Sequence, residues 1–249
     1  WQKLNWIETA PKIDNYDRYL DYFRSLEKDN VRIVVCGGEP FMNPKFADLL
    51  EIIRDKKWSV FITTNASIRN KRAMNALKDI DDVGLEISAD GVEQSYDAIR
   101  WPNTWDAWVK DFAYYLGHIK HRRINSISIR FVANFFNAHD YYKMCLFAEK
   151  NRVITNPCLL SWPEWLSWHV LTDEERMLTI DQIETNLCEI KTKKHLDYIK
   201  EMIDDIKKHH HIKIHRDQFI SKYSKICELR KINPRIYLNH LPTLANEFR

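Results

Sequence analysis

The chain has 249 residues, of which 45% are hydrophobic and 29% are charged, and its formal net charge is +3. This composition is typical of a globular protein with a sizeable core and excludes a disordered chain. The slight charge gives no support for nucleic-acid binding, and no apolar run approaches the roughly 18 residues of a membrane span. We therefore expect neither nucleic acid nor a membrane as a partner. Five scattered cysteines form no disulfide framework, which favours a reducing cytoplasm.

The first elements along the chain are a helix and a short strand. Asp14 and Asn15 are helix-capping residue types, and apolar residues at mostly helical spacing follow them, so we predict a helix over residues 14–28. Residues 31–35 form an apolar, β-branched run that stops at glycine and proline. Such a run is typical of a buried parallel strand.

The segment Gly37-Gly38-Glu39-Pro40 follows this strand and is the first candidate binding site. Only five glycines occur in the chain, and two of them are adjacent here. Glycine lets a ligand lie against main-chain groups, the carboxylate of Glu39 suits an ammonium group, and Pro40 ends strand pairing. A tight strand-to-helix turn without any ligand would explain the same residues, and this alternative stays open.

Strands and helices alternate from here to about residue 160. Further strands are predicted at 59–63, 83–88, 126–133 and 155–161. Helices are predicted from Asn43-Pro44 onward, with Pro at the first helical position, and at 69–78, 104–121 and 138–150. This order predicts a parallel sheet with right-handed crossovers, as in a partial α/β barrel.

The alternation changes beyond about residue 153. Residues 173–210 predict one or two charged amphipathic helices, which begin at a capping-box sequence, Thr172-Asp-Glu-Glu175. Residues 213–249 predict another helix, ending near Asn233-Pro234, and then a loop. We therefore expect an α/β barrel part over residues 1–160 and a mainly helical extension over residues 161–249 packed on it.

Four segments in a fixed order carry a resemblance to a known family. They are Gly37-Gly-Glu-Pro40, Thr63-Thr-Asn-Ala66, Ser88-Ala-Asp-Gly91 and Tyr96-Asp-Ala-Ile-Arg100. In this order they resemble the radical S-adenosylmethionine (radical SAM) enzymes, particularly the subgroup with one partial auxiliary extension, called a twitch domain. The resemblance runs from about residue 31 to about 137 and implies a partial (β/α)6 barrel. Family members often have Gly where Ala66 stands, so we expect that turn to be made differently.

The resemblance implies an enzyme that cleaves S-adenosylmethionine (SAM) reductively at a [4Fe–4S] cluster. The resulting 5′-deoxyadenosyl radical would take a hydrogen atom from a substrate, which in twitch-type relatives is often a peptide or protein. It also implies an electron donor. The residues themselves do not identify the substrate or the bond that changes.

The resemblance also implies roles for polar residues at the strand ends. Gly37, Gly38 and Glu39, ahead of Pro40, would meet the amino group of the methionine part of SAM. Thr63 and Asn65 end the next strand. Ser88 would bind the carboxylate or the ribose, Asp90 would lie near the ribose, and Asn134, in preference to Asn137, would bind the ribose hydroxyls.

Structural alternatives exist for several of these residues. Asp90-Gly91 fits a plain turn equally well. Asn134 and Asn137 could cap the helix predicted at residue 138. For Arg100 we favour a structural role, in which a charge-assisted bond ties its helix to the turn before it.

One hallmark of the family, the Cys-x3-Cys-x2-Cys loop that binds the cluster, is not in this sequence. The cysteines are Cys36, Cys145, Cys158, Cys188 and Cys227, and no two are close enough to form it. Two explanations stay open. Either the sequence begins downstream of the loop, so that the first barrel strand and the cluster cysteines precede Trp1, or the protein is a degenerate relative that serves as a cluster-free binding or scaffold subunit. The same spacing argues against an auxiliary cluster.

Other candidates carry less weight. His211 and His215 are spaced like a divalent-metal pair, but a solvated, Lys-rich helix end is the favoured interpretation. The tryptophans between Trp162 and Trp168 are a candidate wall of the substrate cavity, although core packing is the commoner role of tryptophan. An unrelated α/β-barrel hydrolase is disfavoured because no motif of nucleophilic catalysis is present.

Overall fold

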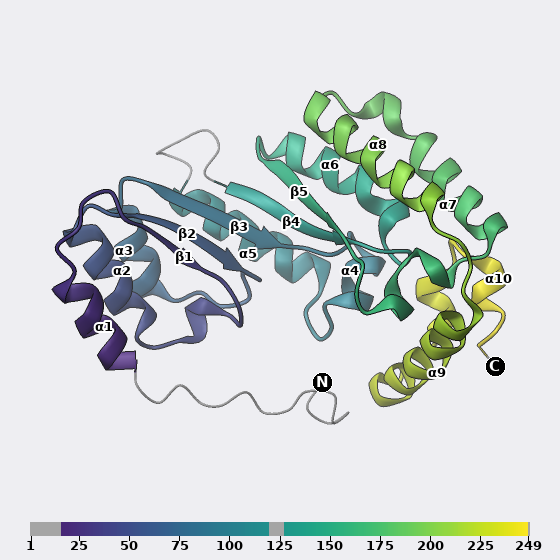
Figure 1. Cartoon of the computed structure of the whole chain (residues 1–249), viewed down its shortest axis with the longest axis horizontal. Helices are drawn as coiled ribbons and strands as arrows, with labels where there is room; N and C mark the ends of the chain where they lie inside the picture. Colours follow the sequence, from purple (N-terminus) through teal and green to yellow (C-terminus); the bar gives the residue numbers. More distant parts are fainter. Residues whose placement is uncertain (1–15, 120–126, 249) are drawn as a thin grey trace.

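Figure 1 presents a computed structural model of the chain, which describes residues 16–119 and 127–248. Five parallel strands form one sheet in chain order, and each pairs with the next. They are β1 (Arg32–Val35), β2 (Ser59–Thr64), β3 (Val83–Ser88), β4 (Ile127–Ala133) and β5 (Ile154–Leu159). The predicted α/β fold with a parallel sheet is confirmed. The additional first strand of a six-stranded barrel was predicted ahead of Trp1 and so is not among the described residues.

Helices connect the strands. They are α1 (Tyr16–Ser25), α2 (Phe46–Asp55), α3 (Lys71–Lys78), α4 (Gln94–Ile99), α5 (Trp105–Ile119) and α6 (Tyr141–Lys150). The predicted caps Asp14 and Asn15 lie outside the described residues. The prediction for α2 was wrong at its start: the side chain of Asn43 accepts a hydrogen bond from Lys45 N and holds a turn, so the helix begins two residues after Pro44.

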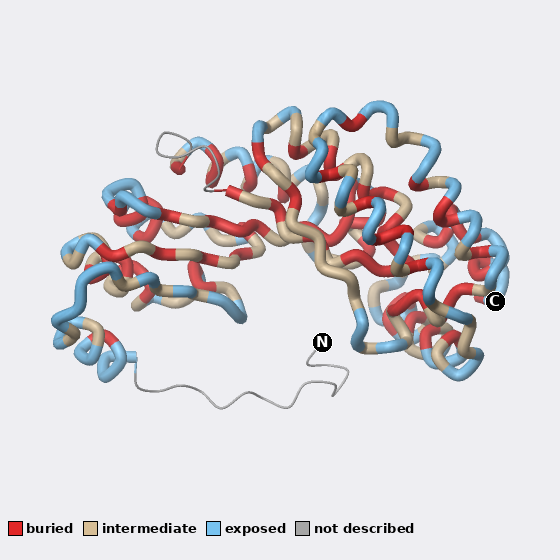
Figure 2. The backbone as a smooth tube through the Cα atoms, turned by 45° about the horizontal axis from the view of Figure 1, so that its top comes forward, coloured by how far each residue is buried: buried red, intermediate tan, exposed pale blue. Residues whose placement is uncertain are grey.

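The two faces of the sheet differ in burial because strand side chains alternate in direction. In β2, Val60, Ile62 and Thr64 are buried, whereas the residues between them are partly exposed. The buried strand residues join α2, α3 and α5 in one hydrophobic core (Figure 2). The opposite face of the sheet, which we call the inner face, carries side chains that are more exposed and more polar.

The C-terminal part is helical, as predicted, and gathers at the end of the molecule far from α1 and α2 (Figure 1). Its α-helices are α7 (Asp173–Glu184), α8 (Lys193–Lys208), α9 (Lys213–Arg230) and α10 (Pro242–Ala245). Short 3-10 turns precede and connect them, notably η4 (Glu164–Leu166), η5 (Trp168–Val170) and η7 (Pro234–Leu238), and a further one, η3 (Ala138–Asp140), lies between β4 and α6. The predicted capping box is present, because Thr172 and Glu175 exchange side-chain and main-chain bonds. No helix in the described part of the chain is long and apolar enough to cross a membrane.

Helix α8 packs against β5, one of the two edge strands of the sheet. The main-chain N–H of Thr155 in β5 donates a hydrogen bond to Nε2 of His195 at 3.2 Å, so it is satisfied without a further strand. Burial lowers the pKa of His195 below its ordinary value, although the neighbouring Glu149 opposes this shift. The neutral ring can therefore accept at one nitrogen and donate to Glu149 at the other.

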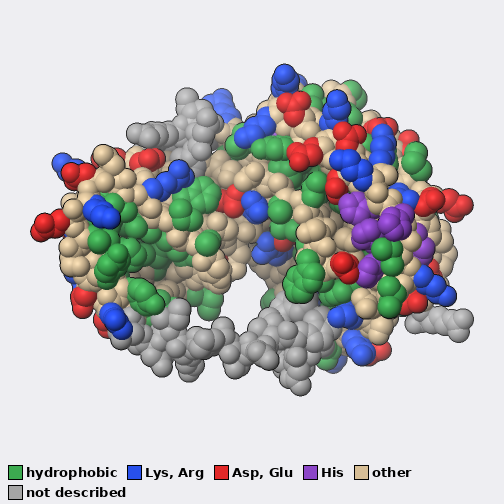
Figure 3. All heavy atoms as spheres, in the orientation of Figure 1, with side chains coloured by type: hydrophobic (Ala, Val, Ile, Leu, Met, Phe, Trp, Pro, Cys, Tyr) green, Lys and Arg blue, Asp and Glu red, His purple; other side chains and the backbone are tan. Residues whose placement is uncertain are grey.

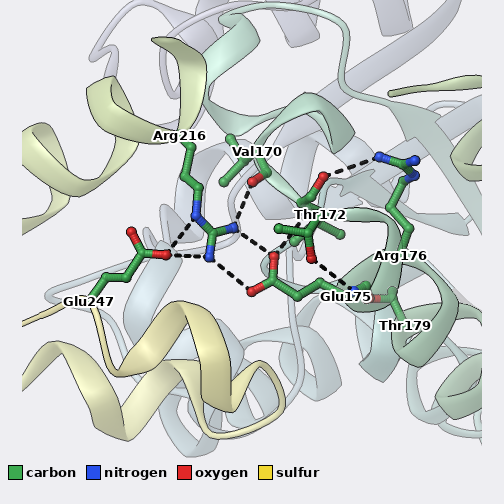
Figure 4. Close-up of polar contacts among 8 residues, drawn as sticks. Val170, Thr172, Glu175, Arg176, Thr179, Arg216 and Glu247 are labelled. Carbon is green, nitrogen blue, oxygen red and sulfur yellow. Dashed lines mark hydrogen bonds and ion pairs between the residues drawn. The ribbon is translucent and has the colours of Figure 1, made fainter. Parts of the chain in front are cut away.

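A buried ion-pair network fixes the C-terminal helices to one another (Figure 4). The guanidinium of Arg216 in α9 meets Glu175 of α7 through two bonds, of 2.6 and 3.0 Å, and also binds Glu247 and the carbonyl of Val170. The side chains of Arg216 and Glu175 are only 6% and 3% exposed. Burial alone would raise the pKa of Glu175, but the bonds from Arg216 and Thr172 lower it.

We expect Arg216→Met to lower the free energy of unfolding by about 3 to 5 kcal/mol, because Glu175 would be left buried without a counter-charge. Urea denaturation measures this change. The matched control is Asp173→Asn, which breaks the exposed pair between α7 residues Asp173 and Arg176 and should cost less than about 1 kcal/mol. Equal losses in the two variants would contradict the assigned role.

A second buried pair consists of two stacked histidines. The rings of His139 and His240 lie 3.6 Å apart, with 14° between their planes. Burial, reinforced by the neighbouring His139, lowers the pKa of His240 to about 3. Burial also lowers the pKa of His139, although the negative charge of Asp140 opposes this shift. Both rings are therefore neutral in the folded protein near pH 7.

Stability should fall as the pH drops below 6.5. The unfolded chain binds a proton at the ordinary histidine pKa of 6.5, whereas folded His240 does not, so the unfolded state gains up to about 1.4 kcal/mol per pH unit from this group. Urea denaturation at pH 7 and pH 5 should show a smaller loss for His240→Phe than for the wild type. Exposed His210→Phe is the control, and the same pH dependence in all three proteins would refute the prediction.

Candidate functional site

The carboxyl end of β1 opens into a backbone cradle. Gly37 and Gly38 adopt φ angles of +87° and +57°, and a Cβ added to either would meet no atom within 4 Å. Positive φ values favour glycine, and the open space above both residues leaves their main-chain groups accessible. The structure therefore provides room for a ligand against this turn.

The carboxylate of Glu39 ties the end of β1 to the end of β2. Its Oε1 accepts bonds from Thr64 Oγ1 at 2.7 Å and from Phe41 N at 3.3 Å, and its Oε2 accepts Asn65 N at 2.8 Å. A carboxylate has about four acceptor positions, so these three donors leave about one for a ligand. Glu39 thus shapes the cradle, a structural role that the sequence did not suggest.

Ala66, where the resemblance led us to expect a turn made differently from that of glycine, has a φ of +58°. Its N–H donates to Thr64 Oγ1 at 3.0 Å. The left-handed conformation costs a non-glycine residue roughly 1 to 2 kcal/mol, which the surrounding bonds can offset. The turn after β2 therefore keeps a conformation that glycine would also allow.

Asp90, after β3, is held on both oxygens. Oδ1 accepts the N–H of Val132 at 2.9 Å, and Oδ2 pairs with Arg100 at 2.5 Å. The structural role predicted for Arg100, which ties its helix to the preceding turn, is confirmed. Asp90 itself braces the ends of β3 and β4 against each other.

Asn134 and Asn137, after β4, brace their own loop. Asn137 Oδ1 accepts Asn134 N at 2.8 Å, and Asn134 Oδ1 accepts Phe136 N at 2.9 Å. The amide of Asn137 donates to the carbonyl of Asp90 at 2.9 Å. Neither side chain caps η3, so their alternative role is the loop itself and not the helix start.

A cavity of about 670 Å³ lies beside these strand ends. Asn65 and Asp90 line it, together with Tyr96, Arg100 and Trp101. Its volume falls in the usual range of small-molecule sites, roughly 300 to 1,000 Å³. Asn134 instead lines a smaller cavity of about 130 Å³. The predicted residues therefore share one edge of the sheet but not one cavity.

A protein-family model described as the radical SAM superfamily matches residues 5–131, slightly more than half of the chain. The chain belongs to the radical SAM superfamily. No curated protein sequence matches it. Among solved structures it is similar to Streptococcus suis SuiB, in crystal structures without a named ligand, bound to S-adenosylmethionine and bound to the precursor peptide SuiA. Each match has 16% identity, a TM-score of 0.46 and 62% coverage of this chain. The radical SAM chain spans 36–37% of the length of those structures.

The inner face of the radical SAM sheet carries a polar cluster that the sequence analysis missed. Glu86 of β3 is buried there, accepts a 2.7 Å bond from Asn156 of β5 and lies 3.8 Å from the guanidinium of Arg130 in β4. Ser88 is directly opposite Arg130, so both side chains are on this face. Polar residues at alternate positions of otherwise apolar strands were the available signal, but the register that brings them together was not visible in the sequence.

The described residues do not fit a [4Fe–4S] cluster. Within residues 16–119 and 127–248, no group of three or more His, Cys, Asp or Glu residues is placed to hold a metal ion. Of the cysteines, Cys145 and Cys227 are buried, and Cys36 and Cys188 are exposed. Histidines do gather on the surface of the C-terminal part (Figure 3). There His215 lies 3.4 Å from Glu164, and His211 precedes α9, so the two histidines considered as a metal pair do not share a helix face.

The tryptophans of the predicted cavity wall divide among three environments. Trp168 is fully buried and donates to Asp205 at 2.7 Å, which is a core role. Trp165 lines the 130 Å³ cavity, and Trp162 is 80% exposed. Trp101, which was not part of that prediction, lines the larger cavity and is 51% exposed.

We expect Glu39→Ala to lower the free energy of unfolding by about 2 kcal/mol, because three donors lose a charged acceptor. Urea denaturation measures the loss. Glu27→Ala, at an exposed position in the same part of the chain, serves as the control and should have little effect. In a double-mutant cycle, Thr64→Val should cost less in the Glu39→Ala background than in the wild type, and full additivity would argue against the bond between them.

Proposed function

We propose that this chain binds S-adenosylmethionine at the carboxyl ends of its strands and acts as a radical SAM enzyme. The observation that carries the proposal is the open Gly37–Gly38 cradle next to the Glu39 carboxylate, in a chain of this superfamily. The cradle offers main-chain acceptors and one remaining carboxylate lone pair. These groups suit the ammonium of the methionine part.

The carboxylate of the methionine part requires donors or a cation. We assign Ser88 and Arg130 to it, because they are paired across β3 and β4 on the inner face and the Arg130 side chain is 35% exposed. The 3.8 Å separation from Glu86 is long for a hydrogen bond, so the guanidinium keeps donors available. Thr63 lies on the same face, directly opposite Glu86.

The nucleoside part would occupy the 670 Å³ cavity. Asn65 reaches this cavity, and its Oδ1 already accepts Ser67 N at 2.8 Å, which leaves its amide N–H groups for a ribose hydroxyl. Asp90 would act through the shape of the loop, because both of its oxygens are engaged. Asn134, in the neighbouring cavity, would act from the substrate side.

A [4Fe–4S] cluster, if bound, would pass one electron from a donor to SAM, which would release methionine and leave a 5′-deoxyadenosyl radical able to take a hydrogen atom from a substrate. The described residues offer no ligand set for that cluster, so we assign its ligands, and the contact with an electron donor, to parts outside them. We further propose that residues 1–160 form the SAM-binding part and that residues 161–249 are a twitch-type extension. A peptide or protein is the proposed substrate.

Gly38→Leu should abolish SAM binding and leave a folded protein. The side chain would fill the cradle, while its φ of +57° costs only about 1 to 2 kcal/mol for a non-glycine residue. Isothermal titration calorimetry with SAM measures the affinity, and circular dichroism checks the fold. Gly117→Leu is the control, because Gly117 is exposed on α5 and also has nothing within 4 Å.

Unchanged SAM affinity in Gly38→Leu would show that this turn does not bind the cofactor. A second measurement separates an enzyme from a cluster-free binding protein. Iron and sulfide are determined in the complete gene product after anaerobic reconstitution, and 5′-deoxyadenosine is quantified after reduction in the presence of SAM. Retained SAM binding without iron uptake would support the binding protein and refute the enzyme.

A further inference from the structure

The smaller cavity lies where the C-terminal helices meet the sheet part. It is lined by α4, by the loop after β4, by η4 and by α9, and we call it the α4–α9 pocket. Its volume is about 130 Å³. It shares Ile99 with the 670 Å³ cavity, so the two cavities are neighbours on either side of one residue.

The walls of the α4–α9 pocket are mainly apolar. They include Ile99, Phe136, Trp165, Leu166, Phe219 and Ile226. An engineered apolar cavity of about 150 Å³ in another protein binds benzene, so a cavity of this size holds one aromatic ring or one branched aliphatic side chain. The apolar lining makes such a group a better occupant than water.

One charged residue, Arg230, lies at this pocket, and no carboxylate of the described residues is paired with it. Its Nη1 donates to the carbonyl of Ala98 at 2.5 Å, and its guanidinium stacks 5.1 Å from the ring of Trp101. In the part of the chain that the structure describes, Arg230 makes no ion pair. Burial lowers the pKa of Arg230 below its ordinary value, although Tyr223, Cys227 and Tyr237 oppose this shift.

Arg216 provides the comparison on the same helix. It is buried in α9 four turns earlier, and two carboxylates, from Glu175 and Glu247, neutralise it. A half-buried guanidinium is costly unless an anion compensates it. At Arg230 the described chain supplies only a carbonyl and an aromatic ring, so the position is suited to an anion that comes with a ligand.

We propose that the α4–α9 pocket binds an aromatic amino-acid side chain whose neighbouring carboxylate pairs with Arg230. The ring fills the apolar cavity, and the carboxylate accepts the free N–H groups of the guanidinium. The inference rests on the proposed function only in treating this group as part of the substrate, because the pocket adjoins the proposed SAM cavity. Binding itself can be measured without the cluster.

The test compares N-acetylphenylalanine with N-acetylphenylalaninamide, which differ only in the carboxylate. Ligand-observed NMR titration of the wild-type protein should give an affinity for the acid about tenfold higher than for the amide. The Arg230→Gln variant should bind the acid only as tightly as it binds the amide. Lys225→Gln, which removes an exposed positive charge from the same helix, should leave the preference unchanged.

A variant that fills the pocket provides a second, independent test. Ile226→Trp should abolish binding of both ligands, with the fold checked by circular dichroism. Equal affinity for acid and amide in the wild type, or an undiminished preference in Arg230→Gln, would overturn the proposal. If the wild-type protein binds N-acetylphenylalanine but not SAM, only the proposed function is refuted. If it binds SAM but neither phenylalanine ligand, only the proposal for the pocket is refuted.

Discussion

The geometry of the strand ends depends on carboxylates that accept main-chain N–H groups from the neighbouring strand. Glu39, after β1, accepts Asn65 N just beyond β2, and Asp90, after β3, accepts Val132 N near the end of β4. Parallel strands bring their carboxyl ends to one edge, but the loops that leave them have no ladder of their own. These two carboxylate-to-main-chain hydrogen bonds therefore fix the positions of the loops without filling the space between them. The cradle at Gly37 and Gly38 can remain open because Glu39 holds the backbone immediately after it.

This bracing explains why motif residues are only partly available to a ligand. Asp90 is fully engaged by Val132 and Arg100, whereas Glu39 keeps about one acceptor position. The polar groups with capacity to spare lie instead on the inner face, where Arg130 stands opposite Ser88. The carboxylates at the strand ends therefore determine the shape of the site, and the inner face of the sheet supplies its charged group.

The sequence was sufficient to predict the parallel α/β order, because β-branched runs bounded by glycine and proline mark buried strands locally. The sequence also allowed us to predict that Arg100 ties its helix to the preceding turn, because Arg100 and its partner Asp90 are only ten positions apart. It could not reveal the Glu86–Arg130–Asn156 cluster, since that cluster depends on the register of three strands. The start of α2 was misplaced because the side chain of Asn43 competes locally with the helix. The α4–α9 pocket was beyond reach, since its walls come from segments more than 100 residues apart.

The two arginines of α9 show how the helical part is coupled to the sheet part. Arg216 binds within the C-terminal helices, through Glu175 and Glu247, and so sets the position of α9 among them. Arg230, at the other end of the helix, contacts Ala98, which lines the smaller cavity, and Trp101, which lines the larger one. An anion bound at Arg230 would instead reduce the cost of keeping its charge half-buried. Helix α9 is therefore held at its first end by a buried ion-pair network and contacts the sheet part at its second end, next to both cavities.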